Sequence, residues 1–152
     1  MSQYWSPAVR ELTPYVPGEQ PRERVIKLNT NENPYPPAPG VSEALRNYAV
    51  DHLRLYPDPT SLALRETLAD TYGVSVAETF VGNGSDEVLA FAFQAFFCHG
   101  APLDVPSITY SFYPVYANLY GVELRKHPLN NQWEVDLDAL ANDSERSGVI
   151  FA

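Results

Sequence analysis

The residues best suited to chemistry lie in one short stretch, VGNGSDEVLAFAFQAFF, at positions 81–97. Gly84 is the second of two glycines, and Ser85, Asp86 and a further acid follow it before a long apolar run. We expect a strand, a tight turn and the N-terminus of a helix. Free backbone N–H groups and the helix dipole converge there and can hold an anion. In the alternative interpretation the glycines only shape a turn, and Ser85 or Asp86 only caps the helix.

Two familiar phosphate loops do not fit this stretch. It lacks the lysine of a Walker loop, and Glu87 stands where a dinucleotide fingerprint needs its third glycine. The loop after the next expected strand contains Tyr110. Loops at the carboxyl ends of parallel strands gather on one rim, so we expect Tyr110 beside the turn. A phosphate cradle next to a flat aromatic ring suits a phosphorylated conjugated ring, and pyridoxal phosphate is such a molecule.

Alternating helices and strands are expected to hold this turn in place. Their apolar periodicity, proline positions and glycine stops predict helices at 41–53, 60–73, 86–97, 110–121 and 136–143, and strands at 78–84, 102–107, 122–129 and 147–152. This order predicts an α/β fold with a mainly parallel sheet and helices on its faces. The helix at 86–97 is apolar nearly all round, so we expect it to be covered on both sides.

Proline sets the N-terminal part apart from the rest. Eight of the 14 prolines fall in the first 39 residues, where they exclude helix interiors. We therefore expect residues 1–39 to form an extended arm, with one short strand at 24–29, and residues 40–152 to form the layered part. The last expected strand is a core strand with nothing after it, which predicts a truncated chain.

Composition excludes several classes of protein. A net charge of −9 opposes binding to nucleic acid. No apolar run approaches the ~20 residues that cross a bilayer, and the start lacks the features of a signal peptide, so we expect a cytoplasmic protein without a membrane partner. Cys98 is alone and is expected to be a buried free thiol. The histidines, His52, His99 and His127, are scattered, so we expect surface positions and no metal site.

Four stretches occur in an order and spacing that resemble one family: KLNTNENPYPPAP, LRLYPDP, VGNGSDEVLAFAFQAFF and PSITYSFYPVY. They resemble histidinol-phosphate aminotransferases, which are fold-type I pyridoxal-phosphate enzymes, and the resemblance covers positions from about 12 to 152. It implies an arm at 1–39 and the first part of the cofactor-binding large domain at 40–152. It also implies a homodimer in which histidinol phosphate and 2-oxoglutarate exchange an amino group, a step of histidine biosynthesis.

The resemblance assigns cofactor-binding roles around the glycine turn. Gly84, Ser85 and Asp86 would hold the phosphate of pyridoxal phosphate through their backbone, together with the Ser85 hydroxyl. Tyr110 would stack on the pyridine ring, unless it is only a core tyrosine. We expect Asp86 and Glu87 to bind neighbouring N–H groups and to complement the helix dipole, pointing away from the phosphate.

Three further residues match family positions outside the turn. Tyr56 resembles the tyrosine that reaches the cofactor phosphate of the other subunit, although it could also be a core aromatic that ends a helix. Tyr15 resembles the arm tyrosine that lies over the substrate. Asn31 resembles an arm residue near the carboxyl end of the substrate, although it could equally cap a turn.

The sequence departs from the family at its chemistry. In the family reaction, substrate amine displaces a lysine from the cofactor, and that lysine then moves the proton. The lysines here are Lys27 and Lys126, and neither resembles the family's Schiff-base lysine, which comes much later in the chain. The acid for the pyridine nitrogen and the substrate arginines are also missing. We therefore predict that this chain contains no catalytic residue and does not transaminate by itself.

Three alternatives remain open. Threonine-phosphate decarboxylases and aromatic aminotransferases share much of this N-terminal pattern. A non-catalytic dimerising or binding module could retain the phosphate turn and bind cofactor without activity. A nucleotide-binding domain fits poorly, because the lysine and the third glycine are absent.

Overall fold

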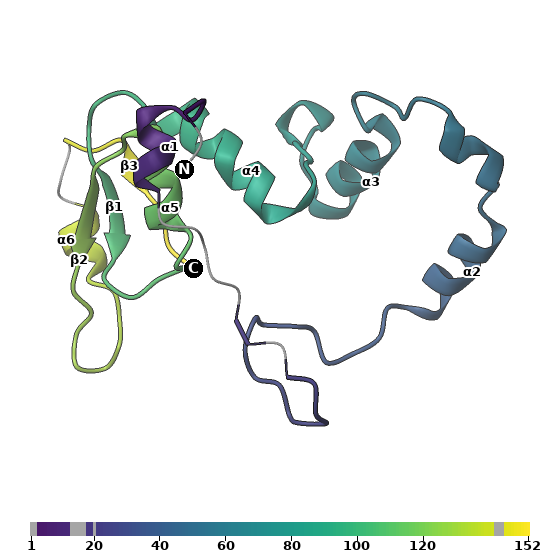
Figure 1. Cartoon of the computed structure of the whole chain (residues 1–152), viewed down its shortest axis with the longest axis horizontal. Coiled ribbons are helices and arrows are strands. Elements are labelled where there is room, and N and C mark those ends of the chain that lie inside the picture. The colour runs from purple at the N-terminus through teal and green to yellow at the C-terminus, as the bar shows by residue number, and fades with distance from the viewer. Residues whose placement is uncertain (1–2, 13–17, 20, 142–144) are drawn as a thin grey trace. The chain divides into compact units, whose positions relative to one another are not determined.

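The computed structural model describes the chain at positions 3–12, 18–19, 21–141 and 145–152. Two units can be distinguished (Figure 1). The first, called here the sheet unit, comprises Gly82–Ala152 together with Met1–Tyr15, and the second, called the helical unit, comprises Val16–Val81.

A parallel sheet forms the centre of the sheet unit. Its strands are β1 (Leu103–Pro106), β2 (Leu124–His127) and β3 (Gly148–Val149), in the order β2-β1-β3, and both pairings are parallel. Parallel neighbours need crossover connections, which here contain α5 (Tyr113–Tyr120) and α6 (Leu137–Ala141). The predicted α/β fold with a parallel sheet is confirmed.

Helix α5 follows its sequence signals closely. Pro114 lies in the first turn, where its missing N–H costs nothing. Gly121 ends the helix in the left-handed region at φ 68°, and its N–H donates to the carbonyl of Ala117. The expected limits of this helix are therefore confirmed at its C-terminus, while its first regular turn begins at Tyr113 rather than at Tyr110.

The core lies where β1 meets α5 and the helix that follows the glycine turn. That helix is α4 (Gly84–Ala92), and it continues as a π-helical turn, η3 (Phe93–Phe97). The buried cluster contains Phe93, Leu103, Val105, Tyr113, Tyr116, Ala117 and Val122. All of β1 is buried, which is typical of a central parallel strand and explains why its sequence does not alternate.

The apolar helix is covered on one side only within the described residues. Phe93 is fully buried, whereas Phe91 and Phe96 are 47% and 65% exposed. The expectation that this helix is covered on both sides is thus wrong for the sheet unit. One face contacts the core through Phe93, and the other face keeps Phe91 and Phe96 largely exposed.

The helical unit consists of short helices with little interior. These are α2 (Pro39–Asn47), the 3₁₀ turn η1 (Val50–Arg54), α3 (Leu62–Tyr72) and the 3₁₀ turn η2 (Val76–Glu78). Of its described hydrophobic residues, Ala69 is the one that is buried. The single helix predicted at 41–53 is broken, because Tyr48 takes an extended backbone (φ −66°, ψ 128°) between α2 and η1.

Helix α3 has the predicted limits but a different cap. It begins after Ser61 and ends at Gly73, which has φ 67°. Neither Thr60 nor Ser61 caps it with its side chain. Instead the carboxylate of Asp58 accepts the N–H groups of Thr60 (2.9 Å) and Leu62 (2.6 Å). These bonds lower the pKa of Asp58, because they favour the charged carboxylate.

Three local predictions are wrong. The arm is not wholly extended, because α1 (Pro7–Glu11) forms with Ser6 as its cap, accepting the N–H of Val9 at 3.3 Å. No strand forms at 24–29 or at 78–84. The backbone at Thr79 is extended, but a strand also needs a hydrogen-bonded neighbour, and none of the described residues provides one.

Candidate functional site

Two positions of the turn at the start of α4 favour glycine. At Gly82 an added Cβ would lie 2.9 Å from Oε2 of Glu87 and 3.0 Å from a methyl group of Val88. At Gly84 the backbone has φ 83°, a left-handed conformation that disfavours side chains. The sequence therefore produces a tight turn that leads directly into the first turn of the helix, as predicted.

The first turn of α4 has backbone N–H groups with no acceptor inside the helix. The N-cap residue, Asn83, makes no side-chain capping bond, and the N–H of Gly84 donates to the carbonyl of Gly82 at 3.0 Å. The amides of Ser85 and Asp86 come next, and first-turn amides have no acceptor within their own helix. Together with the positive end of the helix dipole, they can bind an anion.

The two acids of this turn are bonded to other donors. Oε2 of Glu87 accepts the N–H of Asn83 at 2.6 Å, which confirms that Glu87 binds a neighbouring backbone N–H. Asp86 differs from the expectation, since its Oδ1 accepts the phenol of Tyr110 at 3.3 Å. Neither carboxylate competes with an anion for the amides of Ser85 and Asp86.

Tyr110 lies beside the turn, as the topology of a parallel sheet predicted. Besides its bond to Asp86, its ring lies 6.1 Å from that of Phe112 at an interplanar angle of 22°, and it meets the edge of Tyr113 at 5.5 Å. The residue as a whole is 37% exposed. A partly exposed ring held by aromatic neighbours can stack on a flat ligand.

A second tyrosine contacts the same turn and was missed by the sequence analysis. The phenol of Tyr116 donates to the backbone carbonyl of Asp86 at 2.7 Å. The residue is 6% exposed, and burial raises its pKa to about 12, so the phenol stays protonated. The available signal was its spacing from Tyr113 and Tyr120, which places the three rings on one helical face.

The remaining predicted site residues lie outside the sheet unit's described residues. Tyr56 belongs to the helical unit, is 98% exposed and borders a hollow of about 480 Å³ that Tyr48 and His52 also line. Asn31 is exposed in a turn with φ 51°, a conformation that asparagine tolerates. Tyr15 lies outside the described residues. The proposed roles of these residues stay predictions.

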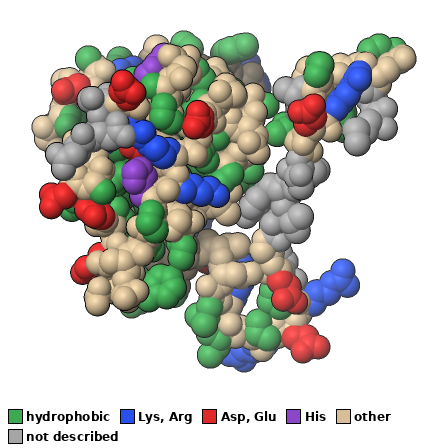
Figure 2. Space-filling model, turned by 90° about the vertical axis from the view of Figure 1, so that its left-hand side faces the viewer, with side chains coloured by type: hydrophobic (Ala, Val, Ile, Leu, Met, Phe, Trp, Pro, Cys, Tyr) green, Lys and Arg blue, Asp and Glu red, His purple; other side chains and the backbone are tan. Residues whose placement is uncertain are grey.

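A buried ion cluster on the sheet was not foreseen. Asp104 of β1 is fully buried and accepts Nε (2.6 Å) and Nη2 (3.0 Å) of Arg125, while His127 and Arg146 lie 3.2 and 3.7 Å from its oxygens. The bond from Arg125 is the main cause that lowers the pKa of Asp104, against burial, which raises it. Figure 2 shows one face of the molecule, on which a histidine lies between basic side chains.

Two expectations about single side chains are therefore corrected. His127 is not a free surface histidine, because its side chain is 21% exposed and its Nε2 contacts Asp104. Cys98 is exposed rather than buried, since the chain leaves the helical conformation there, and its Sγ lies 3.3 Å from the carbonyl of Phe93.

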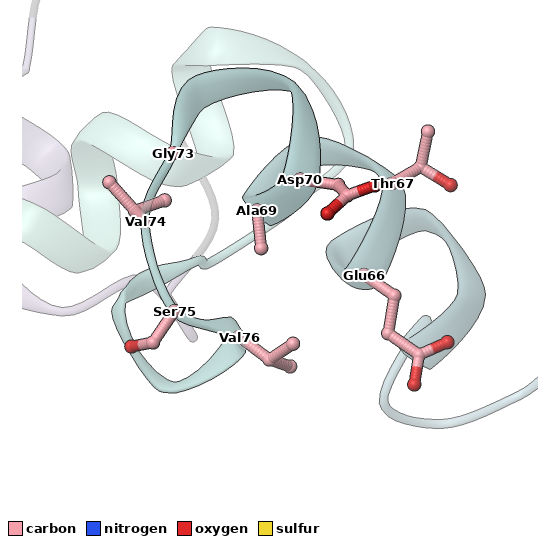
Figure 3. A pocket seen from close by; sticks show the side chains of 8 residues that line it. All are labelled: Glu66, Thr67, Ala69, Asp70, Gly73, Val74, Ser75 and Val76. Carbon is pink, nitrogen blue, oxygen red and sulfur yellow. The ribbon is translucent and has the colours of Figure 1, made fainter.

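A hollow beside α3 in the helical unit does not suit a phosphorylated ring. It measures about 560 Å³ and is lined by residues between 66 and 76 (Figure 3). Ala69 points from α3 toward the Ser75–Val76 segment, and Glu66 and Asp70 bring negative charge. Among the described residues, no aromatic or basic side chain lines it.

Metal binding and membrane spanning find no support in the described residues. They contain no group of three or more histidine, cysteine or acidic residues that could hold a metal ion. None of the helices in the described ranges has the length and apolar character needed to cross a bilayer.

A parallel α/β sheet, a glycine turn at a helix N-terminus and a neighbouring aromatic ring define a class of α/β domain. Within that class the family is clear, because residues 23–152 match the model of the family described as aminotransferase class I and II. The chain belongs to the class I and II aminotransferases.

Two similar relatives carry the same name. A histidinol-phosphate aminotransferase of Chromohalobacter salexigens is 66% identical over 152 residues, which is 100% of this chain and 43% of that protein. The one from Gluconacetobacter diazotrophicus is 58% identical over 139 residues, covering 91% of this chain and 39% of the relative. The chain thus spans less than half the length of these curated relatives.

Solved structures agree on the fold. A candidate histidinol-phosphate aminotransferase from Erwinia carotovora atroseptica superposes with a TM-score of 0.66 at 28% identity, covering 76% of this chain and 34% of that one. An aminotransferase from Mycobacterium tuberculosis gives a TM-score of 0.57 at 23% identity, over 72% of this chain and 32% of its own. The second likeness concerns the fold alone.

Proposed function

We propose that this chain is part of a pyridoxal-phosphate-dependent histidinol-phosphate aminotransferase. The complete enzyme would act in the cytoplasm as a homodimer and transfer the amino group of histidinol phosphate to 2-oxoglutarate. Family membership and the shared name of the relatives support this proposal. Activity belongs to a protein of the relatives' full length, of which this chain spans 43% in the first comparison.

The donor set at the start of α4 fits the phosphate of the cofactor. The amides of Ser85 and Asp86 and the Ser85 hydroxyl supply donors, and Gly84 leaves the backbone open to close approach. One observation carries the proposal: the 3.3 Å bond between Tyr110 and Asp86, which holds an aromatic ring at the same turn. A phosphate cradle and a ring together suit a phosphorylated aromatic ligand better than a plain anion.

Each residue of this site has a distinct proposed role. The backbone of Ser85 and Asp86 binds the phosphate and fixes the position of the ring attached to it. Tyr110 stacks on the ring and excludes water from one face. Bound pyridoxal phosphate serves as the electron sink for the Cα of an amino acid.

Three residues outside the glycine turn complete the proposal. Tyr56 would reach the cofactor phosphate of the partner subunit, and its 98% exposure leaves its hydroxyl available for such a contact. Tyr15 and Asn31 would contact the substrate. In the full-length enzyme, Tyr56→Phe is expected to weaken cofactor binding, and Asn31→Ala is expected to raise KM for histidinol phosphate.

Neither lysine is proposed as the catalytic amine. The ammonium of Lys27 pairs with the carboxylate of Glu32 in the helical unit, and this pairing lowers the pKa of Glu32. Lys126 is an exposed residue of β2. The 152-residue chain is therefore expected to bind pyridoxal phosphate without covalent attachment at a defined lysine, and not to transaminate.

The direct test compares two ligands that differ by the phosphate. We expect the chain to bind pyridoxal phosphate more tightly than pyridoxal, measured by ligand absorbance or by calorimetry. Ser85→Ala should weaken binding of pyridoxal phosphate about tenfold, because one hydrogen bond to a charged group is lost. Ser42→Ala, an exposed serine of α2, is the matched control and should leave affinity unchanged. Equal affinity for both ligands would refute the phosphate site.

Activity assays address the remaining parts of the proposal. Turnover of histidinol phosphate by the isolated chain would contradict the prediction that it lacks the catalytic lysine. For the full-length protein, steady-state rates on histidinol phosphate and on phenylalanine distinguish the proposed substrate from that of an aromatic aminotransferase. A clear preference for phenylalanine would reject histidinol phosphate as the substrate and leave the cofactor site intact.

A further inference from the structure

A single buried phenol ties α5 to the first turn of α4. The hydroxyl of Tyr116 donates to the carbonyl of Asp86 at 2.7 Å. We propose that Tyr116 is a positioning residue, which holds the first turn of α4 in the geometry that binds the cofactor phosphate. This inference rests on the proposed function of that turn.

The acceptor of this bond, the carbonyl of Asp86, lies in the first turn of α4, where the amides proposed to bind the phosphate are found. In an α-helix the carbonyl of Asp86 also accepts the N–H of Ala90, the bond that closes the turn after the cradle. A helix end frays readily, because its first amides have no partners within the helix. A second donor on the Asp86 carbonyl, supplied by α5, restrains that end from outside.

The ring that carries the donor hydroxyl, that of Tyr116, is restrained by aromatic neighbours. The ring of Tyr116 stacks on Tyr120 at 6.3 Å with an interplanar angle of 7°, and it contacts Phe93 (5.4 Å) and Phe112 (5.1 Å). Because the residue is 6% exposed, its ring has little room to rotate. The direction of the hydroxyl group is therefore set by the core of the sheet unit.

Asp86 is fixed at two points by two tyrosines. Tyr110 binds its carboxylate at 3.3 Å, and Tyr116 binds its carbonyl at 2.7 Å. Two bonds of different direction on one residue define its orientation, and the amides of Ser85 and Asp86 share the backbone that they restrain. A cradle ordered before the ligand arrives binds more tightly, because less ordering remains to be done on binding.

The test removes one oxygen atom and keeps both rings. Tyr116→Phe is compared with Tyr120→Phe, a residue on the same helix whose hydroxyl has no bond to the described residues of α4. In the ligand-free chain, we expect Tyr116→Phe to speed hydrogen exchange at the amides of Val88–Ala90 by about fivefold. We also expect affinity for pyridoxal phosphate and for inorganic phosphate to fall about fivefold, with affinity for pyridoxal unchanged. Tyr120→Phe should change none of these quantities.

The outcomes separate this inference from the proposal on which it rests. Unchanged exchange at Val88–Ala90 in Tyr116→Phe would overturn the positioning role, whatever the ligand measurements show. An equal loss of affinity for pyridoxal phosphate and pyridoxal would also overturn it, because a purely structural role affects both ligands. If exchange quickens but the wild-type chain does not prefer pyridoxal phosphate over pyridoxal, the restraint on α4 stands and the proposed phosphate site fails.

Discussion

The sheet unit and the helical unit use apolar residues in opposite ways. The sheet unit buries Phe93, Leu103 and Val105 almost completely. In the helical unit, Leu45 and Leu53 are 73% and 71% exposed, although both follow a helical pattern of apolar positions. Similar local patterns thus produce a core in one unit and exposed apolar surface in the other.

The difference comes from contacts between distant segments. In the sheet unit, β1 pairs with β2 and β3, so segments more than 20 residues apart enclose side chains between them. The helical unit depends on local polar bonds, such as the capping box of Ser75 and Glu78 and the guanidinium of Arg65, which donates to the carbonyl of Thr79 at 2.8 Å. Local bonds define a conformation but bury little apolar area, and area is what stabilises a core.

The largest effect is expected from one phenylalanine of the helix after the glycine turn. Phe93→Ala should reduce the free energy of unfolding by about 3–5 kcal/mol, because it removes a buried ring and leaves a cavity. Phe96→Ala, three residues later and 65% exposed, should cost less than about 1 kcal/mol. Chemical denaturation followed by circular dichroism measures both.

The same two variants also test whether the two faces of this helix differ in burial. A cost for Phe96→Ala close to that of Phe93→Ala would mean that the outer face of this helix is covered in solution. The contrast between a covered and an uncovered helix face would then no longer hold for the sheet unit.

The second effect concerns the ion cluster. Asp104→Asn keeps the shape of the side chain but leaves Arg125 and Arg146 without their buried anion. We expect a loss of about 3 kcal/mol in the free energy of unfolding, near the lower end for a broken buried pair because the cations are partly exposed. Asp70→Asn on α3 of the helical unit is the control and should have little effect. Equal midpoints of denaturation for the two variants would contradict the prediction.

The same carboxylate gives the sheet unit a pH dependence. Arg125 holds the pKa of Asp104 below its ordinary value of 3.8. A group whose pKa is lower in the folded than in the unfolded state adds stability above its unfolded pKa, and this stability is lost as the pH falls through the folded pKa. The unfolding free energy of the wild-type chain should therefore fall more steeply below about pH 4 than that of Asp104→Asn. Parallel pH profiles would exclude Asp104 as the cause.

Sequence patterns predicted the fold well where the signals are local. Pro114 and Gly121 mark α5, and the apolar strand β1 and the order of the elements give a parallel α/β sheet. The prediction failed at 24–29, because a strand needs a hydrogen-bonded neighbour that a local pattern cannot supply. It also joined α2 and η1 into one helix, because Tyr48 has no feature that marks a break.

Only part of the candidate site could be predicted from the sequence, because some of its contacts join distant segments. Sheet topology placed Tyr110 beside the turn, because loops at the carboxyl ends of parallel strands meet. Tyr116 and the cluster of Asp104 and His127 were missed. Each depends on which residues of distant segments face one another, such as the register that sets Asp104 opposite Arg125. Charge and aromatic spacing alone do not fix that register.

The smallest effect is expected from replacing the glycine that ends a helix in each unit, and these two replacements compare the units directly. Gly121 ends α5 at φ 68° and Gly73 ends α3 at φ 67°, and in both cases a Cβ would meet no atom within 4 Å. Replacing either by alanine therefore introduces the same backbone strain, about 1 kcal/mol, and nothing else. Gly121→Ala should lower the midpoint of global unfolding, because α5 is part of the core. Gly73→Ala should mainly reduce helix content measured by circular dichroism, because α3 is held by local bonds. If both variants lower the global midpoint equally, the helical unit unfolds together with the sheet unit, and the contrast between the two units fails.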